Sequence, residues 1–261
     1  MKNTKNIKLL IITGIILTGI CVWYIWPDAA AVNDVPGDTA QGQEDQLNQE
    51  KPNEENKIDE SGLKITEDLQ NDIDAGYLIL VNKTHGLDRD YKPEDLTGIR
   101  YYAADRSAEG RFMRAAAADA FHSMAEEARR QDIVFVMTTA YRSYGFQATL
   151  YNNYVANHGQ AAADRFSARP GYSEHQTGLA VDVSAASVDY RLTREFSGTR
   201  EGRWLSENAH LFGFIIRYQE GTEEITGYQY EPWHVRYVGL TAAEYIHTHG
   251  ITLEEYLDKI K

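Results

Sequence analysis

Apolar residues are distributed very unevenly along this 261-residue chain. One unbroken apolar run extends from Leu9 to Trp26, whereas the stretch from Val32 to about Ser61 is rich in Gln, Asn, Asp and Glu. That stretch has almost no large apolar residue, so it cannot bury enough surface to offset the entropy of ordering. Periodic patterns resume near Leu63. The pattern therefore predicts an apolar helix, a disordered acidic linker and one folded domain.

Within the folded region, helical and strand periodicities alternate. Apolar residues recur at helical spacing from Met113 to Arg130, which predicts an amphipathic helix. The segment 144–159 predicts a second helix closed by Gly159, and residues 204–214 predict a helix that leads into a strand. Runs that predict strands are Ala75–Asn82, Ile133–Tyr141, Gly178–Ser184 and Tyr230–Gly239. This order predicts the α+β fold class, with helices packed around a small, mainly antiparallel sheet.

The N-terminal run has the length and flanks of a membrane anchor. Lys2, Lys5 and Lys8 precede it, and 18 helical residues at about 1.5 Å each span about 27 Å, close to the thickness of a bilayer's hydrocarbon core. Positive residues favour the cytoplasmic side. We therefore expect a cytoplasmic N-terminus at 1–8, a single-pass signal anchor at 9–26, a disordered acidic linker at 27–62, and an extracellular domain at 63–261.

Two other fates of this segment remain open. Ala29–Ala31 could serve as a signal-peptidase site, in which case the apolar run would be removed. Cys21 could carry a lipid, but a lipobox needs a small residue before the cysteine, and here that residue is Ile20. A retained anchor in the cell membrane is the favoured interpretation.

Charge and cysteine content narrow the possible partners. The formal net charge is −13, which argues against nucleic acid as a partner because phosphates require a basic surface. Cys21 is the one cysteine, so an intrachain disulfide and a cysteine-based zinc site are both excluded. Any metal would have to be held by His, Asp and Glu.

A dense group of polar residues occurs in "SEHQTGLAVDV", residues 173–183. If the second half is a strand, its apolar side chains point into the core and Asp182 lies on the opposite face. A carboxylate on so apolar a strand needs a partner, and a cation is one such partner. A turn at Gln176–Gly178 would bring His175 back towards Asp182.

A second group lies in "EPWHVRY", residues 231–237. Pro232 favours an extended Glu231, and His234 would offer an imidazole from a strand. With His175 and Asp182 it completes three ligands, which leaves a fourth zinc position for water and Glu231 as general base. Spacing alone leaves the alternative open, since a His or Asp on a strand is more often a core or surface residue. The HExxH signature is absent.

The two segments together resemble a known family. "SEHQTGLAVD" fits the SxHxxGxAxD motif and "EPWH" fits the ExxH motif of the VanY-type D-Ala-D-Ala carboxypeptidases, which belong to the LAS group of zinc peptidases. The similarity also includes "YRSYGFQATLY", "GFIIRY" and "TGYQYEPWHVRYVG", and so covers about residues 75–258. The resemblance implies a LAS/hedgehog-like arrangement, with the zinc site carried by the sheet.

The resemblance also implies roles for individual residues. His175, Asp182 and His234 would bind Zn²⁺, with Glu231 as the catalytic base. Arg142 would be the catalytic arginine, since a fixed guanidinium suits both a terminal carboxylate and a developing oxyanion. Positions similar to substrate-binding positions of the family are Ser143, Gln147, Ser173, Tyr230 and Trp233. For the last two, a role as core aromatics is the alternative.

The resemblance implies that the chain would be a cell-wall hydrolase, a zinc metallocarboxypeptidase whose reaction is classed with that of serine-type D-Ala-D-Ala carboxypeptidases. It would remove the C-terminal D-Ala from peptidoglycan stem pentapeptides, and its partners would be stem peptides or lipid-linked precursors, together with the membrane. Loss of that residue removes the target of vancomycin-type antibiotics, so a contribution to glycopeptide resistance is a further hypothesis. The alternatives are an L,D-carboxypeptidase that trims stem tetrapeptides and a non-catalytic wall-binding module.

Two rival interpretations are disfavoured by the sequence. "SGLK", residues 61–64, fits the S-x-x-K box of penicillin-binding enzymes, but Ser61 ends the predicted linker and no KTG box follows. "HTH" could supply a metal pair through His247 and His249. Because it precedes a predicted C-terminal helix, we interpret it as structural or solvated.

Overall fold

The computed structural model describes residues 65–103 and 108–261, all within one compact unit, Asn48–Lys261. The predicted N-terminus, signal anchor and linker, with Cys21, lie outside the described residues, as does the Ser61–Lys64 box. Among the described helices, none combines the length and apolar character needed to cross a bilayer.

The central sheet has four strands in the order β3-β4-β6-β5, and every neighbouring pair is antiparallel. Their bounds are β3 Val136–Thr139, β4 Ala180–Ser184, β5 Phe214–Ile216 and β6 His234–Tyr237. A separate antiparallel pair consists of β1 Leu96–Gly98 and β2 Phe112–Arg114. In the central sheet Asp182 of β4 pairs directly with His234 of β6. The α+β class with a small antiparallel sheet is confirmed.

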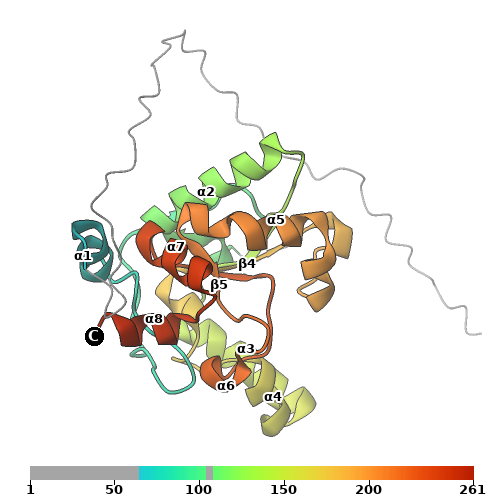
Figure 1. Cartoon of the computed structure of the whole chain (residues 1–261). Helices are drawn as coiled ribbons and strands as arrows, with labels where there is room; N and C mark the ends of the chain where they lie inside the picture. Colours follow the sequence, from blue (N-terminus) through green and yellow to red (C-terminus); the bar gives the residue numbers. More distant parts are fainter. Residues whose placement is uncertain (1–64, 104–107) are drawn as a thin grey trace, which may run out of the picture. The chain divides into compact units, whose positions relative to one another are not determined.

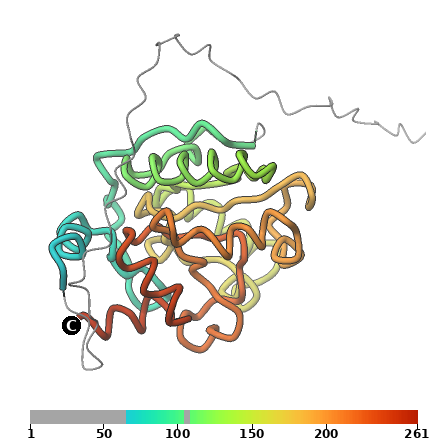
Figure 2. Tube along the Cα trace, turned by 45° about the horizontal axis from the view of Figure 1, so that its top comes forward, coloured from blue at the N-terminus to red at the C-terminus, as the bar shows by residue number. Residues whose placement is uncertain are grey.

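Helices surround this sheet (Figures 1 and 2). The α-helices are α1 Glu67–Asp74, α2 Ala115–Arg130, α3 Tyr144–His158, α4 Gln160–Phe166, α5 Arg200–Asn208, α6 Glu223–Thr226, α7 Leu240–His249 and α8 Leu253–Lys259. Short 3₁₀ turns are η1 Glu109–Arg111, η2 Glu174–Thr177, η3 Ala186–Val188, η4 Arg194–Gly198 and η5 Ala209–Phe212. In the view of Figure 1, α2 and α5 lie above the sheet, while α3, α4 and α6 gather below it.

The core consists of two clusters of buried apolar residues. The larger one joins α2, β3, β4 and α5 through side chains such as Phe121, Phe135 and Val181. The second joins α1, β5, α7 and α8 through side chains such as Leu69 and Ile246. Val181 and Val183 of β4 and Val235 of β6 belong to the larger cluster, so apolar burial contributes to the register of the two site strands.

Most elements predicted from periodicity are present, with shorter bounds. The helix predicted over Met113–Arg130 is α2, and the helix over 144–159 is α3, which ends at Gly159 with a φ of 78°. The helix predicted from 204 begins four residues earlier, as α5, and runs through η5 into β5 as expected. The strands predicted over Ile133–Tyr141, Gly178–Ser184 and Tyr230–Gly239 shrink to β3, β4 and β6.

The strand predicted at Ala75–Asn82 is wrong, because this segment is a series of turns without strand pairing. Its carbonyl groups are satisfied by guanidinium groups instead of by a neighbouring strand. Arg236 donates to the carbonyl oxygens of Tyr77 (3.0 Å) and Ile79 (2.8 Å), and Arg114 donates to that of Ala75 (2.7 Å). The apolar side chains that suggested a strand pack against the two core clusters.

Candidate active site

Two neighbouring strands and the turn before one of them bring His175, Asp182 and His234 together. The turn is η2, and Gly178 after it has a φ of 69°, which reverses the chain so that His175 returns to β4. His175 Nε2 lies 3.3 Å from one carboxylate oxygen of Asp182, and His234 Nδ1 lies 2.8 Å from the other. The turn predicted at Gln176–Gly178 is therefore confirmed.

These three buried side chains form a candidate metal-binding group, with one ligand atom of each lying within 4.8 Å of the others. It is the sole such group of three found among residues 65–103 and 108–261. His247 does not belong to it; its ring stacks on that of His210 at 3.7 Å between centroids. His249 stacks on Tyr245 at 3.8 Å.

The outer nitrogen of each imidazole has its own acceptor. His175 Nδ1 lies 2.6 Å from the carbonyl oxygen of Ala140, and His234 Nε2 lies 3.2 Å from a carboxylate oxygen of Glu174. The inner nitrogens, His175 Nε2 and His234 Nδ1, are both directed at the carboxylate of Asp182. Two imidazoles, each anchored from outside, and one carboxylate are a donor set that fits zinc once the inner nitrogens have lost their protons.

Burial and charge shape the ionisation of this group. Burial, with help from the nearby Arg142, lowers the pKa of His175 to about 4. Burial opposes a charge on His234 as well, but hydrogen bonds to Asp182 and Glu174 prevail and raise its pKa to about 9. The same burial disfavours a charged Asp182, yet the two imidazoles hold its pKa far below the usual range. Asp182 is therefore ionised and available as a ligand.

The group opens into a cavity of about 360 Å³. Most of the residues that the sequence indicated also line it: Arg142, Gln147, Ser173, Tyr230, Glu231 and Trp233. Ser143 is not among its lining residues. Its hydroxyl instead caps α3 by accepting from the Phe146 N–H at 3.2 Å, and its own N–H donates to Glu109.

Glu231 combines a position beside the metal group with an unusual pKa. The residue is held by its backbone, because its N–H donates to the carbonyl of Tyr218 and its carbonyl accepts from the His234 N–H. Burial raises the pKa of Glu231 to about 7, the nearby Asp182 adds to the effect, and His234 and Arg142 oppose it. A carboxyl group with this pKa can both accept and return a proton near neutral pH.

Arg142 and Gln147 present polar atoms that the rest of the fold does not use. Burial lowers the pKa of Arg142, although several anionic groups surround it. Its Nε is buried without a hydrogen-bond partner among the described residues, and so is the Oε1 of Gln147. Gln147 donates its amide to the carbonyl of Ala168 at 2.7 Å, which fixes its orientation. Both groups can bind a polar ligand in the cavity.

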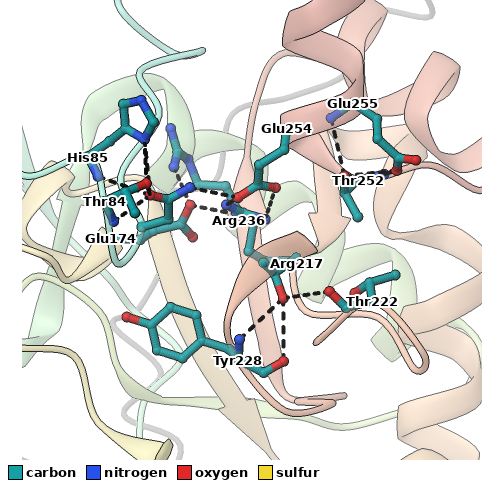
Figure 3. A network of polar contacts seen from close by, with 12 residues as sticks. Thr84, His85, Glu174, Arg217, Thr222, Tyr228, Arg236, Thr252, Glu254 and Glu255 are labelled. Atoms are coloured by element: carbon teal, nitrogen blue, oxygen red, sulfur yellow. Dashed lines mark hydrogen bonds and ion pairs between the residues drawn. The ribbon is translucent and has the colours of Figure 1, made fainter. Parts of the chain in front are cut away.

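Residues that the sequence analysis missed lie directly behind the metal group. Glu174 contacts His234, and Figure 3 shows it beside Arg217 and Arg236. The ring of Tyr218 lies 4.9 Å from that of His234 between centroids. Charged residues at inward positions of otherwise apolar segments were the available signal, as in "GFIIRY" and "WHVRY". Their partners are distant in sequence, so the signal did not identify them.

The sheet, the candidate metal group and the nearby carboxyl group of Glu231 together resemble a metallopeptidase site. A family model described as VanY: D-alanyl-D-alanine carboxypeptidase matches residues 110–240. YodJ of Bacillus subtilis (strain 168) is 40% identical over 210 residues, which make up 80% of this chain and 74% of that protein. The chain belongs to the VanY family of carboxypeptidases.

Solved structures agree with this assignment. The LdcB LD-carboxypeptidase superposes with a TM-score of 0.68 at 41% identity, over 71% of this chain and 87% of that chain. The D,D-pentapeptidase VanY from a VanB-type resistance cassette, determined in complex with Zn(II), gives a TM-score of 0.58 at 34% identity, over 69% and 98%. The serine-type class expected for the reaction is therefore wrong, because this is a family of metal-dependent enzymes.

Proposed function

We propose that this protein is a zinc-dependent D,D-carboxypeptidase that removes the C-terminal D-Ala from peptidoglycan stem pentapeptides. The observation that carries the proposal is the placement of Glu231, with its pKa of about 7, in the same cavity as His175, Asp182 and His234. A binding module needs ligands for its target but no residue that titrates near neutral pH beside a metal group. Membership of the VanY family supports the same activity.

The chain's own residues suit peptide hydrolysis. His175, Asp182 and His234 would hold the zinc, which supplies a Lewis acid for the scissile carbonyl and lowers the pKa of a water. Glu231 accepts a proton from the attacking water and returns it to the leaving amine. Arg142, whose guanidinium group is desolvated, compensates the negative charge of the terminal carboxylate or of the developing oxyanion.

The remaining cavity residues would orient the peptide. Gln147 and Ser173 offer polar atoms to its backbone, and Tyr230 and Trp233 form apolar walls for the terminal side chain. We retain Ser143 as a weaker candidate for a substrate contact, because its hydroxyl is occupied as the cap of α3.

L,D-carboxypeptidase activity on stem tetrapeptides is the second candidate. It is favoured by one observation: LdcB, named as an LD-carboxypeptidase, superposes better than the D,D-pentapeptidase VanY, with TM-scores of 0.68 and 0.58. Both reactions would use the same metal group and base. They differ in the configuration of the residue before the cleaved bond.

One experiment separates these candidates. The full-length protein in detergent is incubated with UDP-muramyl pentapeptide and, separately, with the tetrapeptide, and the products are identified by mass. We expect loss of one D-Ala from the pentapeptide and none of this activity after chelation. Cleavage of the tetrapeptide alone would establish the L,D activity. If neither peptide is cleaved by the zinc-loaded protein, a wall-binding role replaces both.

The site of action is a separate proposal that rests on sequence. We propose that residues 9–26 form a signal anchor that places the catalytic domain outside the cell, with residues 27–62 as its tether. Lysines on the N-terminal side and an apolar run of membrane length support it. Fractionation and surface proteolysis of intact cells test it: we expect a membrane-bound protein whose domain is degraded from outside.

A resistance role would follow from the D,D activity, because shortened stems lack the D-Ala-D-Ala end. Deletion of the gene should then raise glycopeptide susceptibility and the fraction of pentapeptide precursors. Unchanged susceptibility with unchanged precursors would exclude this role without affecting the assignment of the reaction.

A further inference from the structure

Glu174 is a fully buried carboxylate immediately before a candidate metal ligand in sequence. One of its oxygens, Oε1, accepts from Arg217 Nε and from Arg236 Nη1, both at 2.7 Å. The other oxygen, Oε2, lies 3.2 Å from His234 Nε2. Figure 3 shows this carboxylate among the two guanidinium groups. Glu174 thus links a charged network to one ring of the metal group.

The two arginines are themselves held rigidly, and both side chains are completely buried. Arg217 donates two hydrogen bonds to Glu254 of α8, at 2.7 and 2.8 Å. Arg236 donates to the carbonyls of Tyr77 and Ile79. A guanidinium fixed by several acceptors cannot follow a moving partner, so the position of the Glu174 carboxylate is determined by residues from three distant segments.

This position has a consequence for the tautomer of His234. An ionised carboxylate only accepts hydrogen bonds, so Glu174 holds a hydrogen on Nε2. Nδ1 faces the carboxylate of Asp182 at 2.8 Å, and a metal bound there would displace the hydrogen from Nδ1 and leave the one on Nε2. The other imidazole, His175, donates to the neutral carbonyl of Ala140 at 2.6 Å. The two candidate ligands therefore differ: His234 has an anionic partner, which makes its ring the stronger electron donor.

We propose that Glu174 is a positioning residue of the active site, which fixes the tautomer and the orientation of His234 for metal binding. This inference rests on the proposed zinc site. Glu174 has no contact with the metal position or the reacting atoms in this scheme, and it acts through the imidazole alone. Hydrogen bonds from Arg217 and Arg236 hold its carboxylate in place and aim it at the ring.

Replacement of Glu174 by glutamine provides a sharp test. In Glu174→Gln the side chain has one amide oxygen, and the two arginines need it as their acceptor. The NH₂ group of the amide must therefore face the ring of His234. A donor at this place demands an unprotonated Nε2, which moves the hydrogen to Nδ1 and blocks the metal position. We expect zinc to bind about 10- to 100-fold more weakly, with kcat reduced and KM almost unchanged.

Glu254→Gln is the matched control. Glu254 also pairs with Arg217, but it makes no contact with His234. A role of Glu174 in stability alone predicts that both variants lower Tm and that both retain wild-type zinc affinity in chelator competition. That result would overturn the proposal. The proposal requires zinc binding to weaken much more in Glu174→Gln than in Glu254→Gln, because Glu254 reaches the ring only through Arg217 and Glu174.

A measurement on the wild-type protein avoids the risk that the Glu174→Gln variant fails to fold. In ¹⁵N–¹H spectra of the zinc-loaded protein we expect His234 to show a metal-shifted Nδ1 and a proton on Nε2 that exchanges slowly. Coordination through Nε2 would contradict the inference while leaving the zinc site intact. Absence of zinc binding by the wild-type protein would instead remove the proposed function, so the two failures are distinguishable.

Discussion

Glu231 carries the clearest pH-dependent prediction. Its carboxyl group must be ionised to accept a proton, so activity should rise with pH as the group loses its own proton. Burial puts its pKa at about 7, and a bound cation nearby would favour the ionised form and lower that value. We therefore expect kcat/KM to fall at acidic pH with a slope of one and a midpoint at or below about 7.

The variant Glu231→Gln tests whether the fall of kcat/KM at acidic pH, its acidic limb, is caused by protonation of Glu231. We expect kcat to fall by about 10²- to 10⁴-fold, the acidic limb to disappear, and zinc content by metal analysis to stay at the wild-type level. Retention of D-Ala release in this variant would refute the proposed role of Glu231. Loss of zinc together with activity would assign the residue to metal binding instead.

A substitution of Arg142 tests whether this residue recognises the negative charge of the substrate in the cavity. Lysine keeps the charge but loses the planar donor set, so Arg142→Lys should lower kcat/KM for the peptide by about 10²- to 10³-fold. Arg130→Lys is the control, because that side chain is exposed and pairs with Glu127 on the surface of α2. Steady-state kinetics with equal zinc loading is the measurement. Equal rates for both variants would exclude the proposed role.

Much of this site could be predicted from residue types and their spacing. The sequence predicted that Asp182 lies on an apolar strand and that a turn brings His175 back to it. The structure confirms both features. Glu174 escaped notice because nothing within the motif distinguishes a buried anion from a solvated one. Its partners Arg217 and Arg236 lie more than 40 positions away in sequence. Only the packing of the sheet brings these three charges together.

At the scale of elements, the turn from η2 into β4 determines whether the metal group can form. Gly178 adopts a φ of 69°, and a Cβ there would lie 3.0 Å from Leu96 Cδ2 and 3.3 Å from the Arg114 backbone nitrogen. An L-residue in this conformation costs roughly 1–2 kcal/mol. Gly178→Ala should therefore lower the free energy of unfolding by about that amount and weaken zinc binding, because His175 moves away from Asp182.

Gly198→Ala is the control for this substitution. Gly198 has no atom within 4 Å of an added Cβ and no positive φ, so a change within about 0.5 kcal/mol is expected. Denaturant unfolding and chelator competition measure the two effects. Equal stability and equal zinc affinity in both variants would show that the turn tolerates a side chain.

Elements with a strong local signal were predictable, and those that depend on distant partners were not. Helices α2 and α3 follow from helical spacing and from Gly159. The segment 75–82 has the composition of a strand, but strand formation needs a neighbour with free backbone groups. Its carbonyls are taken by arginine side chains, of which Arg236 comes from a position about 157 residues later. The composition of the segment 75–82 does not indicate a partner so distant in sequence.

At the scale of the whole molecule, we expect the described domain to keep its core without a metal. Two clusters of buried apolar residues connect helices and sheet, while the candidate ligands lie on η2, β4 and β6 at the edge of the larger cluster. Zinc bound to this group would join three segments that apolar packing has already brought together. Metal binding should then add to stability without being required for folding, unlike the behaviour of zinc fingers.

Chelation measures this contribution. With free zinc at about 100-fold above its dissociation constant, binding adds about 2.7 kcal/mol, and a domain of this size gains about 2–4 °C in Tm per kcal/mol. We expect EDTA to lower Tm by about 5–11 °C while the far-UV circular dichroism at 25 °C stays unchanged. His175→Ala is the control, because its Tm should no longer respond to EDTA. Unfolding of the chelated protein at 25 °C would mean that the metal, more than the two clusters, holds the sheet in register.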